Sequence, residues 1–202
     1  MPLPTEIEML DELLSAAVDA GRGQGVRLPD VGPPGAALSS ALETRRAVRQ
    51  YSDGPVSEPA LREILNGVGT TDAAGVHRAV ALSGHQDQDA GVYPISEGCL
   101  GARIAGEATV RALREQYAPA PLLLIYYAVP ETIADYYRLL MSAGTAGYLT
   151  WLAAVALGLV GCPFGRGSGD VVRALRAADQ SSAKHLFTLA LGRPAHTEAT
   201  ST

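Results

Sequence analysis

The amino-acid sequence predicts an α+β fold, and three observations carry this prediction. Apolar residues recur at helical spacing in several segments. Two short apolar runs, at 121–129 and 185–191, are bounded by proline or glycine and are typical of buried strands. Helical segments outnumber these strands, and the strands lie far apart in the sequence, which favours the α+β class. The chain has no internal repeat.

Composition limits the function classes. With 202 residues, of which 47% are hydrophobic and 18% charged, the chain is long enough for one domain with a sizeable core. The net charge of −5 argues against a nucleic-acid partner. Cys99 and Cys162 are too few for a disulfide scaffold and have no metal-ligand spacing with the four histidines, so we expect a reduced, cytoplasmic protein without a metal site.

The N-terminal residues 1–37 are predicted to be separate from a single domain at 38–202. Apolar residues at helical spacing predict a helix from Thr5 to Gly21. Residues 22–36 are rich in glycine and proline and predict an extended arm, which either reaches a partner subunit or forms a surface loop. We recognise no secretory signal.

The elements of the domain follow from caps and apolar spacing. Ser39 or Ser40 caps a helix that runs through Arg46, and Ser57 caps another through Leu65. Residues 66–92 are predicted to be mostly irregular, with a short strand at 78–82. Further helices are expected at 107–117, 131–142, 145–159 and 170–178, in addition to the two apolar strands.

The most apolar stretch, Tyr148 to Cys162, has 15 residues, fewer than the roughly 20 that span a bilayer. We therefore predict no membrane partner and interpret this stretch as a helix buried on all sides. Four tyrosines, at 126, 127, 136 and 137, lie near the strand that precedes it. They either belong to the core or line a substrate pocket.

Three arginines, Arg45, Arg46 and Arg49, fall within five residues at the predicted end of a helix. Guanidinium groups at this spacing can offer several donors to one anion, and a phosphate monoester is a natural ligand. The alternative is a helix C-terminus that uses cations against its dipole. The cluster by itself leaves both interpretations open.

A glycine-rich turn runs from Gly158 to Gly169. Glycines let a flat ligand approach the main chain and its amides. The run is neither a P-loop nor a dinucleotide fingerprint, since no Gly-Lys-Ser/Thr follows and no strand precedes it. A helix C-cap followed by a loop has the same composition.

Taken in order, these segments resemble the nitroreductase superfamily of FMN-dependent oxidoreductases over roughly residues 38–194. The resemblance rests on Glu43-Thr-Arg-Arg-Ala-Val-Arg-Gln-Tyr51 with Pro55-Val-Ser-Glu-Pro-Ala-Leu-Arg-Glu-Ile-Leu65, on Ala154-Val-Ala-Leu-Gly-Leu-Val-Gly-Cys-Pro163, and on Leu189-Ala-Leu-Gly-Arg-Pro194. A further segment, Asp89-Ala-Gly-Val-Tyr-Pro-Ile95, is similar to the branch that oxidises azolines in peptide natural products.

The resemblance implies a central, mainly antiparallel sheet flanked by helices and an intertwined homodimer with FMN between the subunits. It implies that Arg45, Arg46 and Arg49, with Arg193, hold the FMN phosphate. The remaining residues that it places along the flavin are Ala90, Gly91, Tyr93, Pro163, Phe164 and Gly165. Of the tyrosines, Tyr137 is the predicted catalytic residue.

The sequence departs from the family pattern at several positions. Ala47 stands where the phosphate motif usually has serine, and Asp89 stands where the azoline branch begins its flavin loop with serine. Anchoring on Tyr137-Arg138 places Glu131 and Thr132 where that branch has a catalytic Lys-Tyr pair.

We therefore expect an FMN-dependent oxidoreductase, either a dehydrogenase acting on a peptide-like or other biosynthetic intermediate or an NAD(P)H-dependent reductase. The substrate would be a small molecule or a peptide, and hydride transfer would occur at flavin N5. One alternative is a degenerate subunit without catalysis that acts as a partner or scaffold of another enzyme. Another is a small-molecule binding protein that uses the same cleft without FMN.

Overall fold

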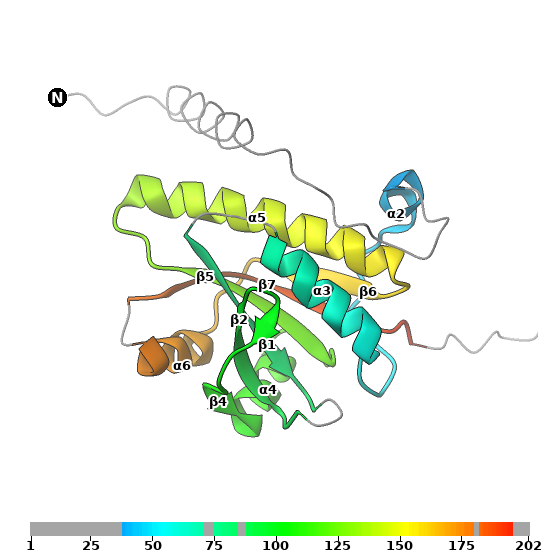
Figure 1. Cartoon of the computed structure of the whole chain (residues 1–202), viewed down its shortest axis with the longest axis horizontal. Helices are drawn as coiled ribbons and strands as arrows, with labels where there is room; N and C mark the ends of the chain where they lie inside the picture. The colour runs from blue at the N-terminus through cyan, green and yellow to red at the C-terminus, as the bar shows by residue number, and fades with distance from the viewer. Residues whose placement is uncertain (1–37, 71–74, 85–87, 180–181, 196–202) are drawn as a thin grey trace, which may run out of the picture.

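The fold was analysed in a computed structural model that describes residues 38–70, 75–84, 88–179 and 182–195. The predicted N-terminal helix and arm lie outside the described residues, and the division of the chain at residue 37 stays a prediction. A seven-stranded sheet forms the centre (Figure 1), with the order β3-β2-β1-β5-β7-β6 and with β4 paired to β2. The strands are β1 (Val76–Leu82), β2 (Gly91–Ser96), β3 (Cys99–Leu100), β4 (Ala105–Gly106), β5 (Leu122–Ala128), β6 (Val160–Phe164) and β7 (Lys184–Gly192).

Helices cover both faces of this sheet, and the central strand β5 shows why. All seven of its residues are buried. Leu122, Leu124 and Tyr126 pack in one hydrophobic cluster with α3 (Glu58–Thr70) and α5 (Ile133–Ala156). Leu123 and Ile125 pack in a second cluster with α4 (Glu107–Gln116) and α6 (Gly169–Asp179). Successive side chains of a strand point to opposite faces of the sheet, so β5 contributes to an apolar layer on each face.

The pairings among strands β1 to β7 are antiparallel, which confirms the predicted α+β class with a mainly antiparallel sheet. The predicted helices at 39–46, 57–65, 107–117 and 170–178 correspond to α2 (Leu38–Thr44), α3, α4 and α6. The predicted strands at 78–82, 121–129 and 185–191 correspond to β1, β5 and β7.

The prediction of separate helices at 131–142 and 145–159 is wrong, because α5 is continuous from Ile133 to Ala156. Gly144 and Gly147 weaken the helical signal but do not end the helix. Thr132 caps its first turn by accepting a hydrogen bond from the Asp135 amide at 3.0 Å. Gly158, with φ of +77°, follows its C-terminal end in the left-handed conformation that glycine adopts easily.

The stretch from Tyr148 to Cys162 is likewise not one helix buried on all sides. It comprises the last part of α5, a turn and strand β6, and the Tyr148 side chain is 41% exposed. By length and composition α5 could cross a membrane, but half of its most apolar window is buried inside the protein. This burial is what a core helix packed on a sheet shows.

Strands β2 and β6 lie in segments where no strand was predicted. β2 lies within and beyond the polar stretch 66–92, where glycine and aspartate hide the alternation. β6 lies within the glycine-rich stretch after α5, and its glycine and proline depress the strand signal. Proline is tolerated in β6 because this is an edge strand of the sheet.

Candidate functional site

The segment from Ala47 to Ser52 runs along the β6 edge of the sheet. Ala47 bridges to Gly161 in parallel, and the Val48 amide donates to the Gly161 carbonyl at 2.9 Å. Further along, the Ser52 amide donates to the Arg193 carbonyl at 3.0 Å. The arginine cluster, β6 and the end of β7, which lie far apart in the sequence, are therefore side by side in the fold.

Gly161 makes this approach possible. A Cβ atom at this position would lie 2.7 Å from the Ala190 carbonyl oxygen and 3.1 Å from Trp151 Nε1, so only glycine fits between β7 and α5. Tyr51 fastens the same segment, because its hydroxyl donates to the Val48 carbonyl at 2.7 Å. Burial raises the pKa of Tyr51, and the nearby Cys162 adds to the rise, so this hydroxyl remains a donor.

Arg49 and Phe164 form the open part of this edge. The Arg49 guanidinium carbon lies 5.5 Å from the centroid of the Phe164 ring. Pro163 and Gly165 are exposed on either side of Phe164. A Cβ atom at Gly165 would have nothing within 4 Å, so there is room beside the backbone here.

The other two arginines of the cluster are held differently. The Arg45 guanidinium carbon lies 4.6 Å from the Trp151 ring centroid and 5.4 Å from that of Tyr148, and the side chain is half-buried against α5. Its Nε atom is buried without a hydrogen-bond partner among the described residues. Arg46 donates to the carbonyls of Glu43 at 2.7 Å and of Arg45, and so caps the C-terminal end of α2.

Arg193 is exposed beside Ser52, at the same edge. Within the described part of the chain, no carboxylate forms an ion pair with Arg45, Arg49 or Arg193. Three cations without such partners leave an edge of positive potential on an otherwise acidic chain. Such an edge can bind an anion.

The predicted flavin residues of the second segment lie elsewhere in the sheet. Ala90 precedes β2, and Gly91 begins it, four strand positions from β6. At the ordinary strand spacing this is about 19 Å. Tyr93 is 5% exposed and packs in the core, with its hydroxyl donating to the Asp89 carbonyl at 2.8 Å. The Asp89 carboxylate forms an exposed ion pair with Arg103 at 3.4 Å.

The four tyrosines separate into two environments. Tyr126 and Tyr127 are buried, and burial raises the pKa of Tyr126 to about 12. Tyr137 is 42% exposed on α5, 14 residues before Trp151, which corresponds to about 21 Å along the helix. One protomer therefore does not bring Tyr137 to the arginine cluster.

A buried histidine holds the loop that follows β6, and no local pattern in the sequence predicts it. The β5–β7 register shifts between Tyr126 and Tyr127, so that Leu186 has no partner on β5. This bulge turns His185 to the face opposite Phe187, where α4 and α6 pack. His185 is 8% exposed, and burial lowers its pKa to about 4, so it is neutral at pH 7.

Hydrogen bonds determine the tautomer of His185. Its Nδ1 accepts from the Ser168 amide at 2.9 Å, so Nε2 carries the hydrogen and donates to Thr188 Oγ1 at 2.9 Å. At the C-terminal end of α4, the hydroxyl of the cap residue Tyr117 donates to the Arg166 carbonyl at 2.7 Å, and Gln116 Nε2 donates to the Gly167 carbonyl at 3.1 Å. These contacts fix the loop that extends from Gly165 to α6.

Comparison with known proteins gives matches among solved structures. No family model matches the chain, and no curated protein matches it. A protein from Anabaena variabilis designated a nitroreductase superposes with a TM-score of 0.63 at 20% identity, over 78% of this chain and 38% of that one. A protein from Ralstonia eutropha with the same designation gives 0.61 at 18% identity, over 80% and 84% of the two chains.

A third structure, from Desulfovibrio desulfuricans, is also designated a nitroreductase and was solved in complex with FMN. It gives a TM-score of 0.52 at 19% identity, over 83% of this chain and 91% of that one. The chain thus spans little more than a third of the Anabaena protein but most of the other two. With the antiparallel sheet between two helical layers, these superpositions show that the chain has a nitroreductase-like fold.

Proposed function

We propose that the chain is an FMN-dependent oxidoreductase whose flavin lies along the β6 edge. The observation that carries the proposal is the juxtaposition of Arg49, Phe164 and Gly165, with cations lacking carboxylate partners on one side and open backbone on the other. A phosphate needs such cations, and a flat ring system needs such an approach. The structure from Desulfovibrio desulfuricans with bound FMN supports the same ligand.

Each residue of this edge has a role in the proposal. Arg49 and Arg193 donate to the phosphate, and Arg45 adds its charge while Trp151 and Tyr148 restrict its guanidinium group. Pro163, Phe164 and Gly165 lie against the ring system and exclude water from one side. The bound cofactor supplies hydride transfer at N5. Arg46 is a weaker candidate, because its donors are already used at the end of α2.

The residues of β2 require a second copy of the chain. Ala90 and Gly91 lie about 19 Å from the β6 edge of their own protomer. We therefore propose a homodimer in which the partner brings these residues, and Tyr137 of its α5, to the flavin. In that arrangement Tyr137 would contact the substrate.

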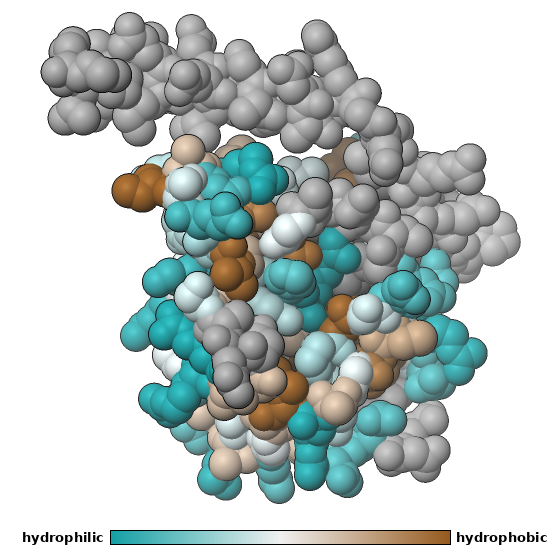
Figure 2. Space-filling view, turned by 60° about the vertical axis from the view of Figure 1, so that its left-hand side comes forward, coloured by the Kyte–Doolittle hydropathy of each residue, from teal (hydrophilic) through white to brown (hydrophobic). Residues whose placement is uncertain are grey.

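An apolar stripe on α5 supports this dimer. Ile133, Tyr137, Met141 and Tyr148 are 77%, 42%, 56% and 41% exposed and recur at helical spacing on one side of the helix. Figure 2 is turned so that the beginning of α5 comes forward, and it shows apolar side chains at the surface of this face. An exposed row of large apolar side chains is typical of an interface.

The flavin is tested by its visible absorption and by FMN titration of the purified protein. We expect a yellow protein, and we expect Arg49→Ala to weaken FMN binding by about 10- to 100-fold, as for the loss of one charge-assisted hydrogen-bond donor. Arg111→Ala, an exposed arginine on α4, is the matched control and should bind FMN like the wild type. A colourless protein that does not bind FMN in the titration would refute the proposal.

The dimer is tested by the molar mass in solution. Met141→Glu places a charge in the middle of the stripe, so we expect the mass measured by light scattering to fall from that of a dimer toward that of one chain. Ala108→Glu introduces the same charge at an exposed position of α4 and should leave the mass unchanged. A wild-type protein with the mass of one chain at high micromolar concentration would contradict the proposed interface.

The contacts around Asp89 favour a second candidate function. Arg103 pairs with its carboxylate and the buried Tyr93 hydroxyl bonds its carbonyl, so this segment is occupied by interactions within its own protomer. A nitroreductase-like subunit without catalysis, which serves as a partner in a biosynthetic complex, would retain the fold in this way. Failure of the FMN titration with an intact dimer would select this candidate over the oxidoreductase.

The oxidoreductase proposal also includes a localisation and a substrate class. We propose that the protein is cytoplasmic and acts on a peptide-like or other biosynthetic intermediate, as the azoline-oxidising branch does. The similarity of Asp89-Ala-Gly-Val-Tyr-Pro-Ile95 to that branch supports this substrate class. Reduction of the bound flavin by NADH or NADPH in the absence of such an intermediate would favour the reductase instead.

A further inference from the structure

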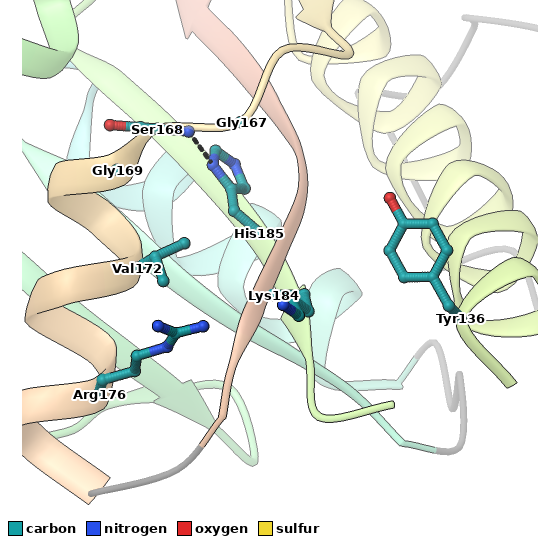
Figure 3. Close-up of a pocket in the computed structure, with 8 residues that line it drawn as sticks. All are labelled: Tyr136, Gly167, Ser168, Gly169, Val172, Arg176, Lys184 and His185. Atoms are coloured by element: carbon teal, nitrogen blue, oxygen red, sulfur yellow. Dashed lines mark hydrogen bonds between the residues drawn. The ribbon is translucent and has the colours of Figure 1, made fainter. Parts of the chain in front are cut away.

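A pocket of about 510 Å³ lies at the beginning of β7, between this strand, one side of α6 and the first turn of α5. Its lining residues are Tyr136, Gly167, Ser168, Gly169, Val172, Arg176, Lys184 and His185 (Figure 3). Phe164, at the β6 edge, pairs with Thr188, four residues after Lys184 on β7. The pocket is thus separate from the proposed phosphate contacts near Gly161.

The charge of this pocket is positive. Two cations from different elements line it, Arg176 of α6 and Lys184 of β7, and no acidic residue does. Lys184 is the only lysine of a chain whose net charge is −5. In Figure 3, Arg176 extends from α6 toward the beginning of β7, where Lys184 lies.

Neither cation has an ion-pair or hydrogen-bond partner among the residues that the structure describes. Arg173, one turn earlier on α6, differs in this respect because it pairs with Asp170 at 2.8 Å. Both residues are exposed, and two cations that line one pocket without a carboxylate partner give it a positive potential. Such a potential favours an anionic ligand.

The backbone adds to this potential. Gly167, Ser168 and Gly169 lead into α6, whose first-turn amides need acceptors from outside the helix and carry the positive end of its dipole, which the Asp170 carboxylate of the same turn offsets in part. The Ser168 amide already donates to His185, so only the amides that follow it in the chain can donate to a ligand. A Cβ atom at Gly169 would have nothing within 4 Å, so this part of the backbone is open.

The remaining walls are apolar or neutral. Val172 and the Tyr136 ring supply apolar surface, and the Tyr136 hydroxyl has no partner among the described residues. His185 forms a neutral wall, because burial lowers its pKa and both of its ring nitrogens are engaged. The volume exceeds that of a bare inorganic ion and is within the range of small-molecule sites.

We propose that this pocket binds a small organic anion, with its carboxylate or phosphate group against Lys184 and against Arg176 in the last turn of α6. The apolar part of the ligand packs on Val172 and the Tyr136 ring, and the Tyr136 hydroxyl donates to a polar atom. This site does not depend on the flavin, so it can be tested with or without FMN on the protein.

The test is a titration of the full chain followed by amide chemical shifts, with benzoate as the anionic probe and benzamide as its neutral counterpart. We expect saturable shifts for Gly167–Val172 with a millimolar dissociation constant, and binding of benzamide at least about tenfold weaker. Arg176→Ala and Lys184→Ala should each weaken benzoate binding by about fivefold. Arg173→Ala, the matched control on the same helix, should leave it unchanged.

Three results of the benzoate titration would overturn the inference. These are equal binding of benzoate and benzamide, unchanged binding in both variants, and shifts spread over other basic residues without saturation. A parallel titration compares inorganic phosphate with phenyl phosphate, and so separates the contribution of the anionic group from that of the apolar ring. If phosphate alone binds as tightly as phenyl phosphate, the apolar wall contributes nothing and the assignment of an organic anion is wrong.

Discussion

Replacing Gly147 by alanine is expected to lower the stability of this protein by about 3 kcal/mol, although alanine is the better helix former. A Cβ atom at this position would lie 1.9 Å from Phe187 Cζ. The Phe187 ring cannot retreat easily, because it is 8% exposed and stacks on Tyr126 with centroids 4.4 Å apart. Gly147 thus sets how closely α5 approaches β7.

The measurement is thermal unfolding of both variants of a matched pair. Gly144→Ala, one turn earlier on α5, meets nothing within 4 Å in one protomer and, compared in the Met141→Glu background that lacks the proposed interface, should raise the stability by up to about 1 kcal/mol. For a chain of this size we expect the melting temperature of Gly147→Ala to be roughly 10 °C lower. Phe187→Leu combined with Gly147→Ala should recover part of the loss, and simple additivity of the two changes would contradict the proposed contact.

The second large effect concerns His185 and acid. Burial lowers the pKa of His185 from 6.5 in the unfolded chain to about 4 in the folded protein. Between these two values the unfolded chain binds a proton at this ring and the folded protein does not. The contribution of this group to stability is complete above pH 6.5 and is lost as the pH falls toward 4. At 1.4 kcal/mol per pKa unit, the loss is roughly 3 kcal/mol.

Two variants separate this titration from the hydrogen bonds. His185→Asn retains an acceptor for the Ser168 amide but does not titrate, whereas His185→Leu leaves that amide and Thr188 without their partner. We expect the Leu variant to be less stable than the Asn variant by about 1–3 kcal/mol at pH 7. The free energy of unfolding, measured in urea between pH 7 and pH 4, should fall less steeply in both variants than in the wild type. Parallel pH profiles would show that His185 is not the titrating group.

The sequence predicted the parts of the fold that local patterns determine. The proline-bounded run before α5 and the final apolar run are strands, and helices begin near Ser57 and Asp170. Strands β2 and β6 escaped prediction because their glycines and prolines are favourable only at an edge or beside a closely packed neighbour. That context is tertiary and has no local signal.

The segments that form the candidate site were predicted from the sequence, but the way they pair was not. The segments with Arg45, Arg49 and Phe164 were predicted to act together, and they meet at the β6 edge. Their pairing through Gly161 could not be read from the sequence, since it depends on which strand is last in the sheet. His185 gave no signal either, because a bulge in β7 decides which face it occupies.

The segment Ala47–Tyr51 also has a consequence for solubility. An uncovered edge strand can recruit strands from other molecules and start aggregation. Here Ala47 and Val48 occupy the hydrogen-bonding edge of β6 at Gly161, and Pro163 has no amide hydrogen to offer where that cover ends. The β6 edge is therefore closed to the addition of another strand. It stays accessible to a flat ligand beside Gly165, so the protein can bind such a ligand without exposing an edge that would pair with other molecules.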